Sequence, residues 1–258
     1  MKISYRVLVA LTLAMALLVI WFSVQYAISS GMLDEKFSQL LIFFPAAFGA
    51  MCGAIAAFFF NLTIEQHKKE KLLADDLRHT IFLIAAKLNQ LRGVKKDMLD
   101  KYESSSARWG AMHAYMDILE KPRLDISTLS FLHEEEPKFL LELDIYDDCY
   151  FLSVRAFNDR SKLHRERLQP EQSKILQTHP EIGHTYQQTE EYMDYALVET
   201  MKVATEGCYQ IIPLTIEQLH AAQKKLMDIA TKRFPKEKFL DHQAIFESKH
   251  NKAFKSDS

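Results

Sequence analysis

The chain contains few residues that break helices. Seven glycines and seven prolines occur in 258 residues, and neither type occurs between Ala54 and Arg92. Folds with many strands need frequent turns, for which glycine and proline are preferred. Their scarcity predicts an all-α protein with long helices.

Motifs with a catalytic or metal-binding spacing are also missing. Cys52, Cys149 and Cys208 lie far apart and form no C-x-x-C pair, which suits a reducing compartment and argues against a disulfide framework or a zinc knuckle. No Walker loop, G-x-G-x-x-G or G-x-S-x-G sequence is present. We therefore expect no nucleotide-driven or α/β-hydrolase chemistry, no cofactor and no metal.

Charge is scarce at the amino-terminal end. Two stretches, 7–28 and 39–62, carry no charge, and a link of about ten residues joins them. At ~1.5 Å per residue each stretch is long enough to cross a hydrocarbon layer of ~30 Å. Residues 1–62 are therefore predicted to form a transmembrane helical hairpin. The charged residues before Leu62 are Lys2, Arg6, Asp34, Glu35 and Lys36.

Basic residues predict the orientation of this hairpin. Lys2 and Arg6 precede the first span, and Lys68, Lys69 and Lys71 follow the second. The positive-inside rule then places both termini in the cytoplasm. A cleaved signal peptide is the alternative, but the apolar run exceeds its usual 7–15 residues. The three lysines are also expected to attract anionic lipid head groups.

Small residues recur every fourth position in the second stretch. Such spacing forms a groove that lets another helix approach closely in lipid. The groove either seats the first span of the same chain or joins copies in a homo-oligomer, and the two roles are compatible. One row is Gly49, Gly53 and Ala57, and the parallel row is Ala46, Ala50 and Ala54.

Residues 63–240 are predicted to form a cytoplasmic helical bundle, followed by a polar, flexible tail at 241–258. The net charge of −2 with mixed signs predicts no general nucleic-acid surface. Apolar residues at 3–4 spacing predict that the second span continues as one helix into the bundle. The block 81–86, IFLIAA, is apolar all round, so we expect other helices to surround it. The stripe is Leu77, Ile81, Ile84, Leu88, Leu91 and Met98.

A second bundle helix is predicted to begin at Pro137 and to run to Leu168. Proline suits the first turn of a helix, and the acidic residues before it suit the positive end of the helix dipole. Two apolar stripes indicate a central helix that is covered on both sides. The first is Phe139, Leu143, Tyr146, Tyr150 and Phe157, and the second is Leu141, Ile145 and Leu152.

Two more helices are predicted near the carboxyl terminus. Thr185 and Gln188 form a capping box for a helix that Gly207 ends. A second box, Thr215 and Gln218, opens the last helix, and Pro235 follows its end. Between the first two bundle helices we expect an irregular link with a short helix near 127–132.

Four segments carry a resemblance, which covers most of Leu77 to Leu168. They are SARWGAM, RLDISTLSFL, EEPKFLLELDI and NDRSKLH, and they follow the predicted membrane hairpin in this order. In this arrangement the chain resembles an uncharacterised family of two-span bacterial membrane proteins. The resemblance implies an architecture and a bacterial inner-membrane location, and it implies no activity.

Candidate catalytic residues are few, and each has a structural alternative. Arg160 and His164 lie four apart on one helix face, somewhat as in HEPN-type RNases, but the spacing is shorter and a polar helix end explains them better. Asp144, Asp147 and Asp148 have the helical spacing of a Mg²⁺ site, without a second acidic motif on a facing helix. His179 and His184 would form a metal site only if His164 or His220 converged on their loop, and no H-E-x-x-H sequence is present.

Two main hypotheses for function follow, with an RNase as a third. In the first, an oligomeric membrane effector senses a ligand or a protein through its bundle and then perturbs the membrane, as in some anti-phage systems. In the second, the hairpin only anchors an adaptor for a cytoplasmic protein. Both hypotheses involve the lipid bilayer as a partner, and neither requires the chain to be an enzyme.

Overall fold

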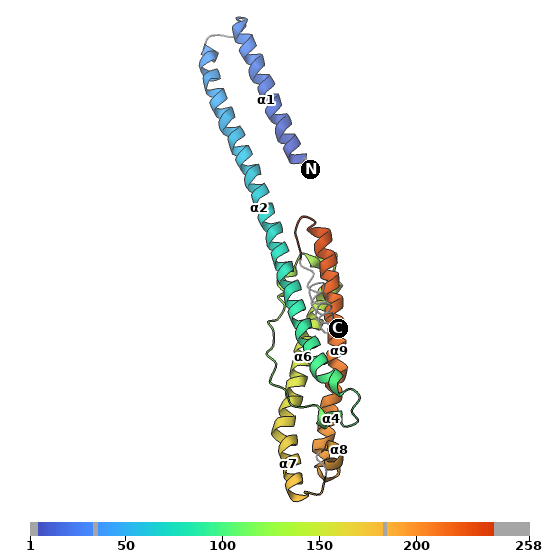
Figure 1. Cartoon of the computed structure of the whole chain (residues 1–258). Helices are drawn as coiled ribbons and strands as arrows, with labels where there is room; N and C mark the ends of the chain where they lie inside the picture. The colour runs from blue at the N-terminus through green and yellow to red at the C-terminus, as the bar shows by residue number, and fades with distance from the viewer. Residues whose placement is uncertain (1–4, 33–35, 183–184, 240–258) are drawn as a thin grey trace, which may run out of the picture. The chain divides into compact units, whose positions relative to one another are not determined.

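A computed structural model describes the chain except for residues 1–4, 33–35, 183–184 and 240–258 (Figure 1). Every regular element in the described part is a helix, which confirms the all-α prediction. The predicted tail at 241–258 lies outside the described residues. The chain divides into two units, Met1–Glu70 and Lys71–Ser258, and each is described by itself below.

The first unit contains helix α1 and the first part of helix α2. Helix α1 is Tyr5–Ser29 and helix α2 is Lys36–Val94, so the division at Glu70 falls inside α2. The prediction that residues 54–92 form one unbroken helix is confirmed. Helix α2 also includes Pro45, Gly49 and Gly53 without interruption.

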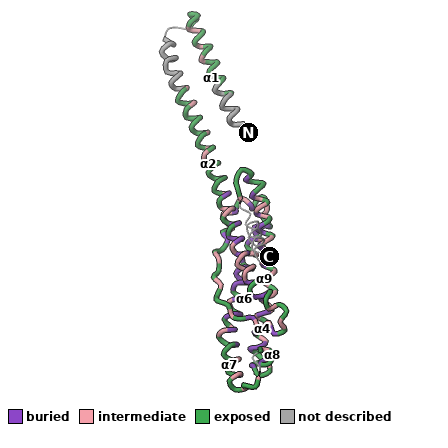
Figure 2. The backbone as a smooth tube through the Cα atoms, in the orientation of Figure 1, coloured by how far each residue is buried: buried purple, intermediate pink, exposed green. Residues whose placement is uncertain are grey.

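Apolar side chains are exposed throughout the described part of the first unit. Figure 2 shows the buried residues gathered in the Lys71–Ser258 unit, and Ala74 is the first residue described as buried. Phe22, Phe58 and Phe60 are each at least 60% exposed. Within the described residues, one helix, Phe48–Tyr102, is long and apolar enough to cross a membrane, and its most apolar window is 0% buried.

The second unit is built on three long helices and several short ones. The end of α2 continues through a π-helical turn, and α6 does the same before α7. A proline occupies the first turn of α6 as predicted. The elements after α2 are η1 (Lys95–Leu99), α3 (Asp100–Tyr102), α4 (Arg108–Ala111), η2 (Ile126–Leu129), α5 (Leu132–Glu135), α6 (Pro137–Leu163), η3 (His164–Leu168), α7 (Gln169–Thr178), α8 (Tyr186–Thr189), η4 (Glu190–Tyr192) and α9 (Tyr195–Arg233).

The main core lies where α2, α6 and α9 pack together. Helices α6 and α9 are antiparallel, because Arg160 contacts Thr205 at one end of the pair and Glu136 contacts Lys225 at the other. The predicted stripe on α2 and most of the first stripe on α6 are buried here. Burying each large aliphatic side chain contributes about 1.5–3 kcal/mol to folding, so these stripes hold the three helices together. A smaller cluster consists of Trp109, Leu168, Ile175, Met193, Leu197, Val198 and Met201.

The predicted helix ends near the carboxyl terminus were partly wrong. The capping box of Thr185 and Gln188 is present, but it caps only the short α8. Helix α9 begins after Asp194, whose side chain accepts a hydrogen bond from the amide of Ala196. It then continues through Gly207 and Pro213 to Arg233.

Tertiary packing explains why α9 passes both of these residues. Cys208, Ile212 and Leu219 are all 0% exposed, so the apolar stripe continues from one side of Pro213 to the other. The free energy of that packing outweighs the cost of about 1 kcal/mol for glycine and about 3 kcal/mol for proline inside a helix. Thr215 is no cap, because its hydroxyl bonds the hydroxyl of Ser153 at 2.9 Å.

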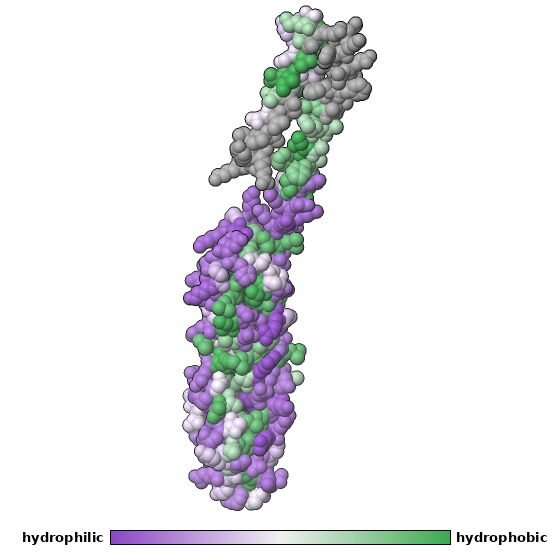
Figure 3. Space-filling model, turned by 180° about the vertical axis from the view of Figure 1, so that it is seen from behind, coloured by the Kyte–Doolittle hydropathy of each residue, from purple (hydrophilic) through white to green (hydrophobic). Residues whose placement is uncertain are grey.

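The expectation that α6 is covered on both sides was also wrong. Leu141, Ile145 and Leu152 of the second stripe are 62%, 48% and 57% exposed. Likewise, Phe82 in the block 81–86 is 53% exposed, so that block is not surrounded. Figure 3 shows hydrophobic patches within the polar surface of this unit.

Candidate functional site

An extended segment, residues 112–125, connects α4 to η2 without any helix. We call this segment the strap. Its backbone amides donate hydrogen bonds to side chains of α6 at every third residue. A period of three is that of a polyproline II helix, which has no hydrogen bonds of its own. The donors are the amides of Tyr115, Ile118, Lys121 and Leu124.

The acceptors form a row on one face of α6, which we call the polar ladder. Its members are separated by three, eight and three residues, a spacing that keeps them on one helix face. Asn158 binds Ile118 twice, since its Oδ1 accepts from the amide at 2.8 Å and its Nδ2 donates to the carbonyl at 3.0 Å. The strap therefore runs antiparallel to α6. The ladder is Asp147, Tyr150, Asn158 and Ser161.

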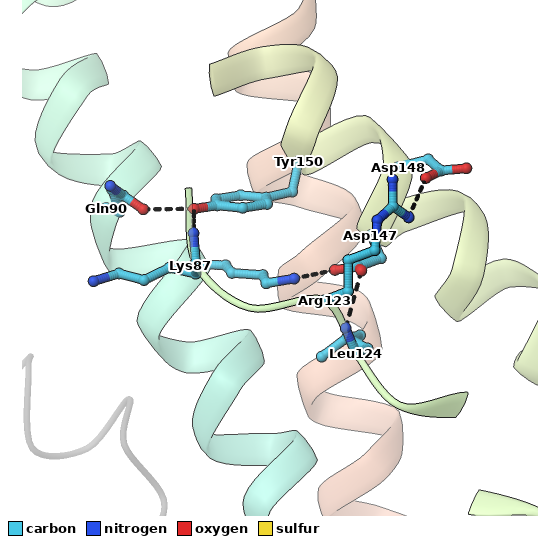
Figure 4. Close-up of polar contacts among 8 residues, drawn as sticks. Lys87, Gln90, Arg123, Leu124, Asp147, Asp148 and Tyr150 are labelled. Atoms are coloured by element: carbon cyan, nitrogen blue, oxygen red, sulfur yellow. Dashed lines mark hydrogen bonds and ion pairs between the residues drawn. The ribbon is translucent and has the colours of Figure 1, made fainter. Parts of the chain in front are cut away.

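Asp147 is a buried member of the ladder and lies nearest the amino terminus of α6. Its Oδ1 accepts a hydrogen bond from Lys87 Nζ on α2, and its Oδ2 accepts from the amide of Leu124 at 3.0 Å (Figure 4). The side chains of Lys87 and Asp147 are only 0% and 2% exposed. Burial lowers the pKa of Lys87, and Asp147 opposes that shift. If either residue lost its partner, the other charge would stay buried without a counter-charge, which is strongly destabilising.

Tyr150 and Gln90 extend this network around the strap. The Tyr150 hydroxyl accepts from the amide of Lys121 at 2.9 Å and donates to Gln90 Oε1 at 2.6 Å. Gln90 Nε2 then donates to the carbonyl of Leu119 at 2.9 Å. Figure 4 shows how side chains from α2 and α6 meet at the strap. One polar network thus joins three segments that lie far apart in the sequence.

Ion pairs on the surface also connect the strap to α6 and to η3. Arg155 pairs with Glu120 at 3.0 Å, Arg165 with Asp117 at 2.9 Å, and Arg123 with Asp148 at 2.8 Å. Exposed pairs of this kind contribute about 0–1 kcal/mol each. They therefore stabilise the position of the strap much less than the buried network does.

The two candidate catalytic residues, Arg160 and His164, are buried at the amino-terminal end of the strap. They are 1% and 0% exposed. The Arg160 guanidinium donates to the carbonyl of Trp109 at 2.8 Å and to that of His113 at 3.1 Å. His164 Nε2 lies 3.1 Å from the carbonyl of Gly110. Both side chains bind the backbone of α4 and the start of the strap, which favours the structural interpretation.

The burial of His164 keeps its imidazole neutral. Burial, with Arg160 nearby, lowers the pKa of His164 to about 4. Nε2 donates its proton to Gly110, and the buried Nδ1 has no partner among the described residues. Gly110 is required at this point, because a Cβ atom there would lie 2.5 Å from Cγ of Tyr186.

The acidic and histidine candidates do not form a metal site in the described part of the chain. No group of three or more metal-binding side chains occurs there. Asp147 and Asp148 pair with Lys87 and Arg123, while Asp144 is exposed. His184 lies outside the described residues.

The predicted membrane-side residues are exposed on α2. Gly49, Gly53 and Ala57 are exposed, as are Ala50 and Ala54, while the side chain of Ala46 lies outside the described ones. No described atom outside the local helix lies within 4 Å of a Cβ atom built at Gly49 or Gly53. The groove is therefore open in the described structure. Lys68, Lys69 and Lys71 are exposed as well.

A shallow hollow of about 420 Å³ lies where η4 meets α9. Glu190, Glu191, Glu199 and Lys202 line it together with apolar side chains. Lys202 bridges Glu190 at 2.8 Å and Glu199 at 3.1 Å. Lys202 thus pairs with two of the three glutamates that line the hollow.

Comparison with protein-family models, curated proteins and solved structures finds no match for this chain. Sequence reasoning identified Asp147 and Asp148, but it missed Lys87 and the polar ladder. The sequence held one signal for Lys87: it directly follows the apolar block 81–86, most of which is buried in the structure. The strap itself has no periodic pattern that would reveal its partners.

Replacing Lys87 by Met should lower the free energy of unfolding by about 3–5 kcal/mol, because Asp147 would stay buried without a counter-charge. The double change Lys87→Met with Asp147→Asn should recover much of that loss, since the amide oxygen still accepts from Leu124. Urea unfolding followed by Trp109 fluorescence, in a Trp21→Phe background, measures both effects. Lys96→Met, at an exposed position, is the control. A double variant no more stable than Lys87→Met would contradict this view.

Replacing Asn158 by Ala should release the middle of the strap, because Ile118 loses both of its backbone hydrogen bonds to α6. Hydrogen exchange of amides 115–121 should become faster while α9 keeps its protection. Asp159→Ala, at the next and exposed position, is the matched control. Unchanged exchange in the strap would show that the ladder does not hold it.

Stability should fall as the pH decreases from 6.5 to 4. Over this range the unfolded chain takes up a proton at His164 and the folded chain does not, so the loss from this group approaches roughly 3 kcal/mol. His164→Gln removes this contribution. The difference in unfolding free energy between the parent and the variant should therefore shrink towards pH 4. A difference that is independent of pH would rule out the neutral buried imidazole.

Proposed function

We propose that this chain is an oligomeric protein of a bacterial inner membrane. Residues 1–62 form a two-span hairpin with both termini in the cytoplasm, and residues 63–240 form a cytoplasmic helical bundle. The bundle receives a ligand or a protein partner, and α2 passes this input to the membrane. The output is a pore or another perturbation of the bilayer, of the kind that serves anti-phage defence.

The exposed apolar surface of α1 and α2 is the observation that carries this proposal. A soluble protein rarely exposes such a contiguous apolar surface, because the hydrophobic effect favours its removal from water. Phe22, Tyr26, Phe58 and Phe60 are 60–74% exposed. A hydrocarbon layer would cover these side chains, and the three lysines that follow would face the head groups.

The open groove on α2 supports an oligomer. Small residues at every fourth position let helix backbones approach, and van der Waals packing then drives their association in lipid. Described atoms of the same chain leave Gly49 and Gly53 uncovered. A second copy of α2 is therefore the proposed occupant of this groove.

Helix α2 supports a connection between input and output. It is one α-helix from Lys36 to Val94, and Lys87 and Gln90 near its end take part in the network around the strap. A signal requires two states with different affinities for the input. We propose that release or retention of the strap distinguishes these states.

The alternative is an adaptor that holds a cytoplasmic protein at the membrane. The strap supports it, because Met116 and Leu119 are 84% and 83% exposed on an extended segment. In this case the hairpin would be an anchor only. The third hypothesis, a HEPN-like RNase, requires Arg160 and His164 to reach a phosphate of RNA, and their burial argues against it.

Full-length protein in anionic vesicles should release an encapsulated dye. The pair Gly49→Ile and Gly53→Ile should reduce release to the level of vesicles without protein, because the larger side chains fill the groove. Ala47→Ile with Met51→Ile, about half a turn around α2, is the matched control and should leave release unchanged.

Two outcomes would contradict the effector. The first is an intact chain that never permeabilises vesicles or cells, either alone or with the products of neighbouring genes. The second is dye release that the Gly49 and Gly53 changes leave unaltered. If the chain binds a cytoplasmic protein without any release, the adaptor is favoured instead.

A further inference from the structure

Helix α6 has one long face that no described element covers. Leu141, Ile145 and Leu152 lie within about 40° of one another on the helix, because they are four and seven residues apart. They are 62%, 48% and 57% exposed. On its other faces, α6 contacts its neighbours: Asn158 binds the strap, Asp147 binds α2 and Ser153 binds α9.

Helix α9 extends this face on one side. The hydroxyls of Ser153 and Thr215 meet at 2.9 Å, so these residues face each other across two antiparallel helices. Leu152 and Leu214 each precede one of these facing residues. Antiparallel helices turn in opposite senses in a common view, so both leucines lie on the same side of the pair. Leu214 is 52% exposed.

We propose that this outer face, Leu141, Ile145, Leu152 and Leu214, is an interface with a second copy of the chain. Helix α6 would meet its counterpart antiparallel about a two-fold axis that passes between residues 148 and 149. This arrangement places Ile145 of one copy opposite Leu152 of the other, and each contact occurs twice. It deepens the proposed function, on whose oligomer it rests, by naming a contact outside the membrane.

The exposed charges of α6 are complementary under this symmetry. Lys138 lies ten and a half residues before the axis and Asp159 the same number after it, so they oppose each other across the copies. Arg155 likewise falls within about one turn of the opposing Asp144. The Lys138 and Arg155 side chains are 89% and 64% exposed, and both aspartates are exposed. A parallel pairing in register would instead place each charge against itself, which is unfavourable.

Asp148 lies in the centre of the apolar face, close to the axis. It pairs with Arg123 of the strap at 2.8 Å, so its charge is already balanced within one copy. The two Asp148–Arg123 pairs would meet at the axis. A polar residue within an apolar seam selects one register at some cost in stability, as in coiled coils. The strap thus contributes Arg123 to the interface.

Disulfide formation in membranes tests the antiparallel register. The full-length chain carries Ile145→Cys together with Leu152→Cys, with Cys52→Ser and Cys149→Ser to remove accessible thiols. Mild oxidation should yield a covalent dimer from the double variant. Each single variant should yield little, because like positions lie seven residues apart along the antiparallel pair, about 10 Å. No dimer from the double variant, or equal dimer from the single ones, would overturn the interface.

Charge reversal gives a second measurement that does not disturb the core. Lys138→Glu should reduce the crosslink, and adding Asp159→Lys in the same chain should restore it. Both positions are exposed, so Trp109 fluorescence in a Trp21→Phe background should show the same urea midpoint in all variants. A reduced crosslink that the second change fails to restore would contradict the pairing.

The same crosslink in the Gly49→Ile, Gly53→Ile background separates this inference from the proposed function. A crosslink that persists when dye release is lost supports the interface and leaves the membrane output dependent on the groove. A double cysteine variant that releases dye yet never crosslinks overturns the interface while the proposed function stands. If release and crosslink both fail in the parent background, both proposals fail.

Discussion

The buried ion pair between Lys87 and Asp147 is the constraint on which the second unit depends. It joins α2 to α6, and the second carboxylate oxygen of Asp147 holds the amide of Leu124. Two charges without access to water tolerate little displacement, because each must keep its partner. The pair therefore sets where α2 meets α6 and where the strap ends.

The polar ladder continues this constraint along α6. A segment without secondary structure leaves its backbone amides without internal partners, and buried amides must find partners elsewhere. Side chains at one helix face supply them at three-residue intervals in the strap, so the strap is ordered without being a strand or a helix. Arg160 and His164 provide partners for backbone carbonyls in α4, just before the strap begins. This explains why two residues with catalytic potential are buried against carbonyl groups.

The outer side of α6 shows how the same helix can serve two purposes. Its inner stripe builds the core, and its outer stripe leaves Leu141 and Leu152 more than half exposed. An exposed apolar stripe on a core helix is costly in water unless something covers it. The open groove at Gly49 and Gly53 presents the same situation on α2. These are the two surfaces for which we propose association with further copies of the chain.

The sequence alone determined the helical class, the absence of a helix breaker from Ala54 to Arg92, the start of α6 at Pro137 and the inner stripes, because these depend on local propensity and on apolar spacing. It did not determine the length of α9, since packing on both sides of Pro213 outweighs the local cost of a proline. It also did not reveal that Lys87 is buried or that the outer stripe of α6 is exposed. Both depend on which neighbours surround a helix face, and contacts between distant segments decide this only once the chain has folded.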